Sequence, residues 1–383
     1  MGAQSYRVHV AEEVLADLDR RLADTRWPDE INGSGWDYGF PLDYLKDLVS
    51  YWRTKFDWRQ WEERLNAFLN FRTDIGGLGI HYLHERGKGP NPLPLLLTHG
   101  WPGSVLEFLR ILPLLTNPGA HGGDPTDAFD IVAPSLPGYG FSDRPSGRGM
   151  TSYRIAELWG QLMSELGYER FGAEGGDWGA SVTTWLGLMA AERVIAIHLN
   201  YIPGSYSPYV GAGARELSKV EQAFVQERDH WRDTEGAYGH IQRTKPQTVA
   251  VGLNDSPAGL AAWIVEKFRT WSDCGGEVER RFSKDELLAN VTLYWVTQTI
   301  GSSIRLYLES GQTPVRFGPE ERVRVPCGIA RFPKEIPMPP REFVERHYDV
   351  VRWTEMPSGG HFAAAEEPEL LAADIREFFR RFR

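Results

Sequence analysis

The pattern of hydrophobic positions separates an amphipathic N-terminal part from a longer part built of short apolar runs. Residues 8–25 and 42–54 carry apolar side chains at helical spacing, with charged side chains on the opposite side. A proline at position 28 ends the first predicted helix, because proline lacks a backbone donor and restricts the residue before it. We expect residues 1–67 to form an extension that packs on a larger core.

From residue 68 the pattern changes to short strands that alternate with helices. Strands are predicted at 68–72, 78–83, 93–98, 129–133, 169–173, 195–199, 323–330 and 350–355, and helices at 105–115, 152–166, 180–191 and 368–382. Continuously apolar runs such as 93–98 are typical of strands that are buried on both faces of a parallel sheet. The alternation predicts an α/β fold, with a mostly parallel sheet flanked by helices, formed by residues 68–200 and 319–383.

Residues 201–318 interrupt this alternation with a predominantly helical and aromatic segment. Asp255-Ser256-Pro257 is a good helix start, with Ser256 as the N-cap and Pro257 at the first helical position. The segment lies between two predicted strands, at the end of the sheet where ligands bind in α/β folds. We therefore expect a helical lid over a site at that end.

Composition restricts the classes of function. The chain has 383 residues, of which 42% are hydrophobic and 12% aromatic, including 14 tryptophans, as suits a large core or an aromatic pocket. A formal net charge of -10 argues against a nucleic-acid partner, since phosphate binding requires a basic surface. Cys274 and Cys327 lie far apart and do not suggest a disulfide framework.

No targeting or anchoring segment is visible in the sequence. The N-terminus lacks a basic segment followed by an apolar one, so no signal peptide is predicted. The leucine-rich run at 93–97 is far shorter than the roughly 20 apolar residues of a membrane-spanning helix. We expect a cytoplasmic protein without a membrane anchor, and the oligomeric state is left open, a homodimer included.

One glycine-rich stretch, Gly175-Gly176-Asp177-Trp178-Gly179, has the composition of a sharp turn from a strand into a helix. Small residues two places before and after a central polar residue allow such a turn, as in the nucleophile elbow of α/β-hydrolases. The central residue is aspartate, where that elbow usually carries serine. A turn that holds a structural or helix-capping aspartate explains the same residues, so the stretch requires support from elsewhere in the chain.

Three further features follow predicted strands where an elbow nucleophile would require them. Segment 98–103 follows a buried strand, and the backbone N–H groups of Trp101 and Trp178 would form an oxyanion hole, unless the segment is a simple turn. His361 is the only histidine between the last predicted strand and the last predicted helix, where the base of an α/β-hydrolase lies. Glu335 is the first carboxylate after the preceding strand, and chain order makes it the acid that orients His361.

An aspartate nucleophile favours displacement at an sp³ carbon followed by hydrolysis of the ester that forms on the enzyme. His361 would activate the water for the second step. Strained epoxides and alkyl halides both fit this chemistry. An epoxide oxygen needs O–H donors such as tyrosine, and a halide needs weaker donors such as an indole N–H. Pattern reasoning does not select a pair among the lid tyrosines, which include Tyr201, Tyr206, Tyr209, Tyr238, Tyr294 and Tyr307.

The ordered set of motifs resembles epoxide hydrolases of the microsomal type, a branch of the α/β-hydrolases, over nearly the whole chain. The matching motifs are Arg26-Trp27-Pro28-Asp29-Glu30, His99-Gly100-Trp101-Pro102-Gly103-Ser104, Pro137-Gly138-Tyr139-Gly140-Phe141-Ser142, Gly175-Gly176-Asp177-Trp178-Gly179, Leu253-Asn254-Asp255-Ser256-Pro257, Leu293-Tyr294-Trp295 and Gly359-Gly360-His361-Phe362. The resemblance implies that Asp177 is the nucleophile, His361 the base and Glu335 its acid. It implies that Tyr238 and Tyr307 polarise the epoxide oxygen.

The resemblance predicts an epoxide hydrolase that makes a vicinal diol without a cofactor or a metal. The tryptophan-rich lid favours an aromatic or bulky apolar epoxide. Membrane-bound relatives carry an N-terminal anchor that this sequence does not show, so a microsomal location is not carried over. Natural-product biosynthesis, for example of enediynes, and breakdown of foreign compounds are both compatible roles. A haloalkane dehalogenase is the alternative chemistry, and a ligand-binding protein without catalytic activity is the alternative class.

Overall fold

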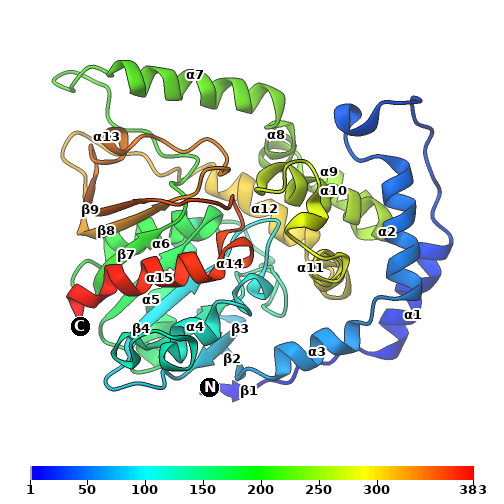
Figure 1. Ribbon diagram of the computed structural model, residues 1–383, viewed down its shortest axis with the longest axis horizontal. Helices are drawn as coiled ribbons and strands as arrows, with labels where there is room; N and C mark the ends of the chain where they lie inside the picture. Colours follow the sequence, from blue (N-terminus) through cyan, green and yellow to red (C-terminus); the bar gives the residue numbers. More distant parts are fainter. Residues whose placement is uncertain (1) are drawn as a thin grey trace.

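A nine-stranded sheet is the frame of the molecule, which a computed structural model describes over residues 2–383 (Figure 1). Its strands are β1 (Gln4–Ser5), β2 (Asn70–Ile75), β3 (Leu78–Glu85), β4 (Leu93–Thr98), β5 (Phe129–Pro134), β6 (Phe171–Gly175), β7 (Val194–Leu199), β8 (Val323–Arg331) and β9 (Tyr348–Glu355). They lie in the order β1-β2-β3-β5-β4-β6-β7-β8-β9. The pairs from β1 to β5 are antiparallel, and those from β5 through β4 to β9 are parallel. The predicted α/β fold with a mostly parallel sheet is confirmed.

Helices cover both faces of the sheet because its strands are apolar on both sides. In β4, Leu96 belongs to one hydrophobic core, and Leu95 and Leu97 belong to a second core. Apolar residues of α5 (Ser152–Glu165) and α6 (Asp177–Met189) pack into the first core. Those of α4 (Leu112–Thr116) and α15 (Pro368–Phe379) pack into the second. Side chains that alternate along each strand thus point into two separate cores, one on each face of the sheet. The ends of the central strands lie between these two cores.

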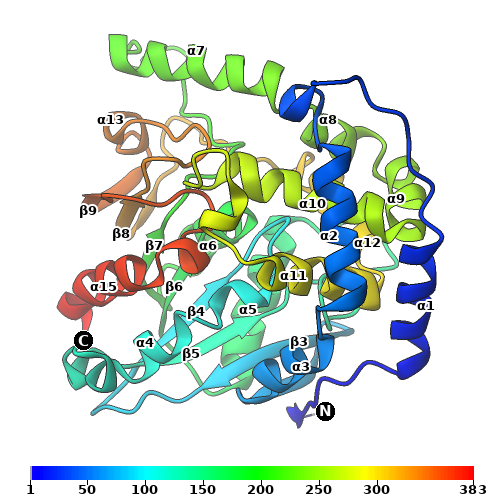
Figure 2. The ribbon, with the colours of Figure 1, turned by 45° about the vertical axis from the view of Figure 1, so that its right-hand side comes forward.

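A helical segment lies between β7 and β8 and covers one end of the sheet (Figures 1 and 2). It comprises α7 (Lys219–Thr234), α8 (Ala237–Thr244), α9 (Pro246–Asp255), α10 (Pro257–Trp271), α11 (Lys284–Thr297) and α12 (Ile300–Ser310). The start of α10 is as predicted, with the Ser256 hydroxyl accepting a hydrogen bond of 3.0 Å from the Gly259 N–H. We call this segment the lid.

The N-terminal helices lie against the lid rather than against the middle of the sheet. They are α1 (Glu12–Ala23), α2 (Leu42–Thr54) and α3 (Trp58–Asn66). Helices α1 and α2 contact α10 and α11, and α3 contacts α11 (Figure 2). The Arg21 guanidinium donates a 2.9 Å hydrogen bond to the Asp255 carbonyl oxygen at the end of α9. The extension therefore braces the outer side of the lid.

Two predicted helices differ from the structure in instructive ways. The first begins at Glu12 instead of residue 8, because Val8 and Val10 are extended and donate their backbone N–H groups to Asn66 and Glu62. The helix predicted at 105–115 is a short 3-10 turn followed by α4. Pro113 cannot donate a backbone hydrogen bond, so it cannot continue a helix begun at residue 105.

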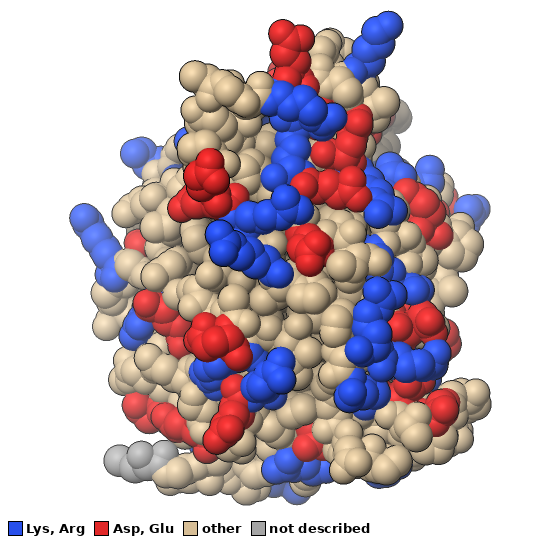
Figure 3. Space-filling view, turned by 90° about the vertical axis from the view of Figure 1, so that its left-hand side faces the viewer, with Lys and Arg blue, Asp and Glu red and all other residues tan. Residues whose placement is uncertain are grey.

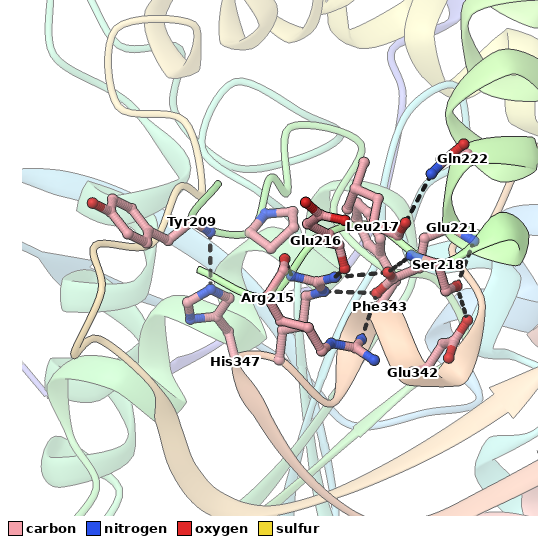
Figure 4. A network of polar contacts seen from close by, with 12 residues as sticks. Tyr209, Arg215, Glu216, Leu217, Ser218, Glu221, Gln222, Glu342, Phe343 and His347 are labelled. Carbon is pink, nitrogen blue, oxygen red and sulfur yellow. Dashed lines mark hydrogen bonds and ion pairs between the residues drawn. The ribbon is translucent and has the colours of Figure 1, made fainter. Parts of the chain in front are cut away.

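A buried polar network fixes the start of α7 to the strand side of the molecule (Figure 4). Glu221 is fully buried, and its carboxylate accepts hydrogen bonds of 2.6 and 2.7 Å from Arg346. Although burial opposes ionisation, Arg346 holds the pKa of Glu221 below its usual range. The Tyr209 N–H donates to His347 Nε2 at 3.0 Å, just before β9. This end of the lid is therefore anchored by charge-assisted hydrogen bonds.

The surface opposite the N-terminal helices mixes both signs of charge. In Figure 3, acidic and basic side chains alternate over the face, with uncharged areas between them. A basic stripe of the kind that tracks a nucleic-acid backbone is not seen on this face. Within residues 2–383, no helix has both the length and the apolar character that crossing a membrane would require.

Candidate active site

Asp177 occupies a strained turn between β6 and α6. It is the first residue of α6 and has a φ of 47°, in the left-handed region that non-glycine residues rarely adopt. Close packing requires the neighbouring glycine, because a Cβ on Gly179 would lie 1.8 Å from the Thr98 carbonyl oxygen. The turn lies next to the end of β4, so the surrounding backbone determines where the carboxylate of Asp177 points.

Of the two side chains predicted from chain order, the histidine contacts Asp177 and the glutamate contacts the histidine. His361 follows β9, and its Nε2 is 3.4 Å from Asp177 Oδ2. Its Nδ1 lies 2.6 Å from Glu335 Oε1, which also accepts a 2.7 Å hydrogen bond from the Ile336 N–H. The His361 backbone N–H donates to the Trp271 carbonyl oxygen at 2.9 Å, which ties this loop to α10 of the lid. The structure thus brings Asp177, His361 and Glu335 into one line of contacts.

The protonation of His361, which lies between Asp177 and Glu335, depends on the charge of Asp177. Burial by itself disfavours the imidazolium, but the carboxylates of Glu335 and Asp177 outweigh burial and hold the pKa of His361 well above its usual value. His361 is therefore protonated at neutral pH while Asp177 is ionised. If Asp177 were converted to a neutral ester, the imidazolium would lose one of its two stabilising charges, and its pKa would fall.

Backbone amides surround the other oxygen of Asp177. The Trp101 N–H donates a 2.8 Å hydrogen bond to Asp177 Oδ1. This approach depends on Gly100, where a Cβ would lie 2.3 Å from Asp177 Cβ. Trp178 lies in the first turn of α6, where backbone N–H groups lack acceptors within the helix. The Trp101 amide thus contacts the carboxylate, and a role of the Trp178 amide in stabilising an oxyanion stays a prediction.

Tyr238 on α8 and Tyr307 on α12 face each other across the site. Their ring centroids are 6.0 Å apart, and Tyr238 stacks on Trp101 at 5.5 Å with an angle of 8° between the rings. Tyr307 packs edge-on against Trp178 at 4.8 Å. Burial, with the negative charge of Asp177, raises the pKa of both phenols, so both hydroxyls stay protonated and can donate.

Three other tyrosines of the lid region have hydroxyls that already donate to backbone carbonyl oxygens. The hydroxyl of Tyr206 donates to the Phe343 carbonyl oxygen at 2.7 Å, and that of Tyr294 donates to the Gly103 carbonyl oxygen at 2.7 Å. Tyr209 donates to Ala212 at 3.4 Å, away from the site. These contacts separate Tyr238 and Tyr307 from Tyr206, Tyr209 and Tyr294, which the sequence pattern did not do.

Tyr201 is a site residue that sequence reasoning did not select. It is buried and packs edge-on against His361, with ring centroids 5.6 Å apart. Trp271 contacts His361 in the same manner at 5.1 Å. The position of Tyr201 directly after β7, at the edge where the site forms, was the available signal. Both rings therefore pack against the imidazole in T-shaped contacts.

Two cavities meet at Asp177, which is the residue that lines both. The larger has a volume of about 690 Å³, within the range of small-molecule pockets, and its lining includes Trp178, Tyr201, Tyr238 and Tyr307. The smaller measures about 20 Å³, and His361 lines it. Within residues 2–383, no group of three or more His, Cys, Asp or Glu side chains has the arrangement of a metal site. The phenols and the imidazole thus adjoin different sides of the carboxylate.

Comparisons with known proteins agree with this arrangement. The family profile "Epoxide hydrolase N terminus" matches residues 3–108, and "alpha/beta hydrolase fold" matches residues 94–235. Epoxide hydrolase 1 of Oryctolagus cuniculus is 41% identical over 398 residues, covering 97% of this chain and 88% of that protein. The Bombyx mori juvenile hormone epoxide hydrolase structure is 33% identical, with a TM-score of 0.85, covering 100% of this chain and 94% of that one. The Aspergillus niger epoxide hydrolase structure is 30% identical, with a TM-score of 0.87, covering 100% of this chain and 97% of that one. The predicted α/β-hydrolase fold is confirmed.

Substituting Asp177→Asn should lower the pKa of His361, because the carboxylate that favours the imidazolium is replaced by a neutral amide. The measurement is an NMR titration of the His361 ring in both proteins. Asp374→Asn is the matched control, since Asp374 is a buried carboxylate that contacts a different histidine, His198, at 3.0 Å. A His361 pKa that is the same in wild type and Asp177→Asn would show that the two groups are not coupled.

Proposed function

The chain belongs to the epoxide hydrolase family, and we propose that it converts an epoxide and water to a vicinal diol through an ester on Asp177. The observation that supports this proposal is the position of Asp177 between two cavities. Neutral phenols adjoin the cavity that is large enough for a substrate. The imidazole adjoins the cavity on the other side. Such a division suits two successive reactions at one carboxylate.

Alkylation is the first of these reactions. An oxygen of Asp177 forms a bond to an epoxide carbon, and the bond from that carbon to the ring oxygen breaks. The ring oxygen takes a proton from the phenols of Tyr238 and Tyr307, which His361 then restores. Asp177 is now a neutral ester, so the pKa of His361 falls and the imidazole becomes a base.

Hydrolysis of the ester is the second reaction. Water forms a bond to Cγ of Asp177 and gives a proton to His361, which Glu335 orients. The negative charge that develops on Oδ1 is stabilised by the Trp101 N–H, already 2.8 Å away, and by the Trp178 N–H. The bond between Cγ and the alkyl oxygen breaks, and that oxygen takes the proton of the new carboxylic acid. The diol leaves, with Asp177 again ionised and His361 again protonated.

Replacing His361 with glutamine should leave alkylation in place and slow ester hydrolysis by roughly 10²- to 10⁴-fold, the usual contribution of a general base. Intact-mass analysis after mixing with an aryl epoxide should then show one persistent adduct, located on the peptide that contains Asp177. Asp177→Asn serves as the control that forms no adduct. Absence of any adduct across a panel of reactive epoxides would contradict the covalent scheme.

Replacing both Tyr238 and Tyr307 with phenylalanine should slow alkylation by roughly 10²- to 10³-fold, because two hydrogen bonds to a charged oxygen are lost. Single-turnover ester formation, followed by rapid quench, measures that step alone. Tyr206→Phe is the matched control, since Tyr206 lines the same cavity but its hydroxyl is bonded to Phe343. Alkylation by the double variant at the wild-type rate would assign the donor role to other residues.

The large cavity is lined by aromatic side chains and by arginines, which suggests a substrate with one apolar end and one polar end. Aromatic residues line it near Asp177, which supports a bulky apolar or aromatic group on the epoxide. Arginine side chains also line it, namely Arg228, Arg232, Arg243 and Arg316. In a chain of net charge -10, this local positive charge favours a substrate whose far end carries an anionic or strongly hydrogen-bond-accepting group.

Arg243→Gln and Arg316→Gln together should lower kcat/KM for a carboxylate-bearing epoxide by roughly threefold to tenfold, the usual contribution of partly exposed charges. Neither arginine forms an ion pair with an acidic side chain in the described part of the chain. The matching neutral amide substrate should be affected less than twofold. Arg341→Gln is the control, because Arg341 pairs with Glu345 and does not line the cavity. Equal losses for both substrates would contradict recognition of an anionic end.

Haloalkane dehalogenation is the second candidate, and one observation favours it. The indole N–H of Trp178 is buried without a hydrogen-bond partner in residues 2–383, and Trp178 lines the large cavity. Chloride or bromide release from haloalkanes would support this chemistry, and diol formation without halide release supports the epoxide. Tight ligand binding without either product would indicate a non-catalytic role. A biosynthetic or a detoxifying role remains compatible with the proposed reaction.

A further inference from the structure

The small cavity on the His361 side of Asp177 has the size of a single water site. Its volume is about 20 Å³, and a buried water needs about 10–15 Å³ together with about two to four polar partners. Polar residues that line it are Thr98, His99, Glu107, Glu174, Asp177, Asn200 and His361. The proposed nucleophile and the proposed base therefore share this cavity with two further carboxyl groups.

Three buried side-chain atoms of the lining residues have no hydrogen-bond partner among residues 2–383. Two are oxygens, Oε1 of Glu174 on β6 and Oγ1 of Thr98 at the end of β4, and the third is the indole nitrogen of Trp101. Glu174 is 2% exposed and Thr98 is 1% exposed. A buried polar group without a partner is unfavourable, so the Glu174 and Thr98 oxygens require a partner that is not a protein atom.

Another buried carboxyl group, that of Glu366, differs from Glu174 because both of its oxygens have hydrogen-bond partners. Glu366 is also buried, but its two oxygens accept backbone hydrogen bonds from Asp273 at 2.8 Å and from Phe362 at 3.0 Å. Among residues 2–383, no hydrogen bond joins the Glu174 carboxyl group to a side chain or to the backbone. Glu174 is therefore not explained as a tether between elements.

Glu107 stands beside Glu174 in this cavity and is held in a fixed position. It accepts a 3.0 Å hydrogen bond from the Ser104 N–H in a capping box, and a Cβ on Gly103 would lie 1.3 Å from its Oε1. Burial, reinforced by neighbouring carboxylates, raises the pKa of Glu107 and of Glu174 to about 8. Both are thus mostly neutral acids at neutral pH, able to donate as well as accept.

We propose that Glu174 and Thr98, together with Glu107, bind the water molecule that hydrolyses the ester on Asp177. The inference rests on the proposed two-step function and adds water-binding residues to it. The bound water gives one hydrogen to Nε2 of His361 and directs a lone pair to Cγ of Asp177. Glu174 and Thr98 hold its remaining hydrogen and lone pair, and they are unchanged by the reaction.

This placement separates the water from the substrate. The two cavities meet only at Asp177, so a bound epoxide that fills the larger cavity does not displace a water in the smaller one. Alkylation and hydrolysis then occur from opposite sides of the same carboxyl group. Residues that hold the water should affect the second reaction and leave the first unchanged.

The test measures the two reactions separately in Glu174→Leu and Glu174→Gln, with styrene oxide as the probe. Rapid quench and intact-mass analysis give the rate of ester formation and the rate of ester loss. Leucine removes the polar group and should slow ester loss roughly tenfold or more, as expected for at least one lost hydrogen bond to the water. Glutamine retains a neutral donor and acceptor and should restore ester loss to within about threefold of wild type. Ester formation should not change in either variant.

Thr98→Val provides an isosteric second variant in case Glu174→Leu folds poorly. It should slow ester loss roughly threefold to tenfold by removing one hydroxyl contact. Thr292→Val is its matched control, because Thr292 on α11 also has a buried, unpartnered hydroxyl but lines neither cavity. Ester loss should be unchanged in that control.

Outcomes of this experiment distinguish the water site from the function on which it rests. If wild type forms no ester, the proposed function fails and the water site fails with it. If wild type forms the ester but Glu174→Leu and Thr98→Val hydrolyse it at the wild-type rate, the water site alone is overturned. Equal slowing of both reactions would assign Glu174 and Thr98 a structural role.

Discussion

Close backbone packing between the end of β4 and the turn after β6 is the constraint on which the site depends. Gly100 and Gly179 have no room for a side chain, because a Cβ at either would approach Asp177 or the Thr98 carbonyl oxygen within 2.3 and 1.8 Å. Asp177 is held in the left-handed conformation as a result. Its carboxylate meets the Trp101 N–H on one oxygen and His361 on the other. The strain at this residue is offset by the two hydrophobic cores on either side of the sheet.

The charge of Asp177 connects this geometry to the proposed chemistry. While the carboxylate is ionised, it helps to hold His361 protonated and keeps the nearby phenols neutral. In the proposed mechanism, alkylation removes that charge, so the imidazole would change from an acid to a base when the ester has to be hydrolysed. The lid contributes the phenols and the aromatic walls, and the network around Glu221 and Arg346 keeps one end of the lid in place.

Local patterns were sufficient to predict most elements and the residues that meet at the elbow. The strand at 93–98 and the helix at 42–54 have the predicted bounds, since each has a clear apolar pattern and clear ends. Chain order selected His361, which lies beside Asp177, and Glu335, which contacts the far side of the His361 ring. Their roles, and those of Tyr238 and Tyr307, stay predictions until kinetic measurements test them.

Features that arise only from tertiary packing were not accessible from the sequence. Val8 and Val10 fit a helical pattern, yet Asn66 and Glu62 hold them extended. Glu174 reads as one polar residue in a strand, and its significance depends on a lack of partners beside a small cavity. The contact of Tyr201 with His361 likewise depends on how β7 and β9 end at the same edge of the sheet.

A single turnover in ¹⁸O-labelled water, with enzyme in excess over epoxide, tests the ester on Asp177 most directly. Water attacks Cγ of Asp177 in this account, so the label should enter the carboxylate of the peptide that contains Asp177. The diol from the first turnover should be unlabelled. Labelled diol together with an unlabelled peptide would mean that water attacks the epoxide itself, which would contradict the central claim.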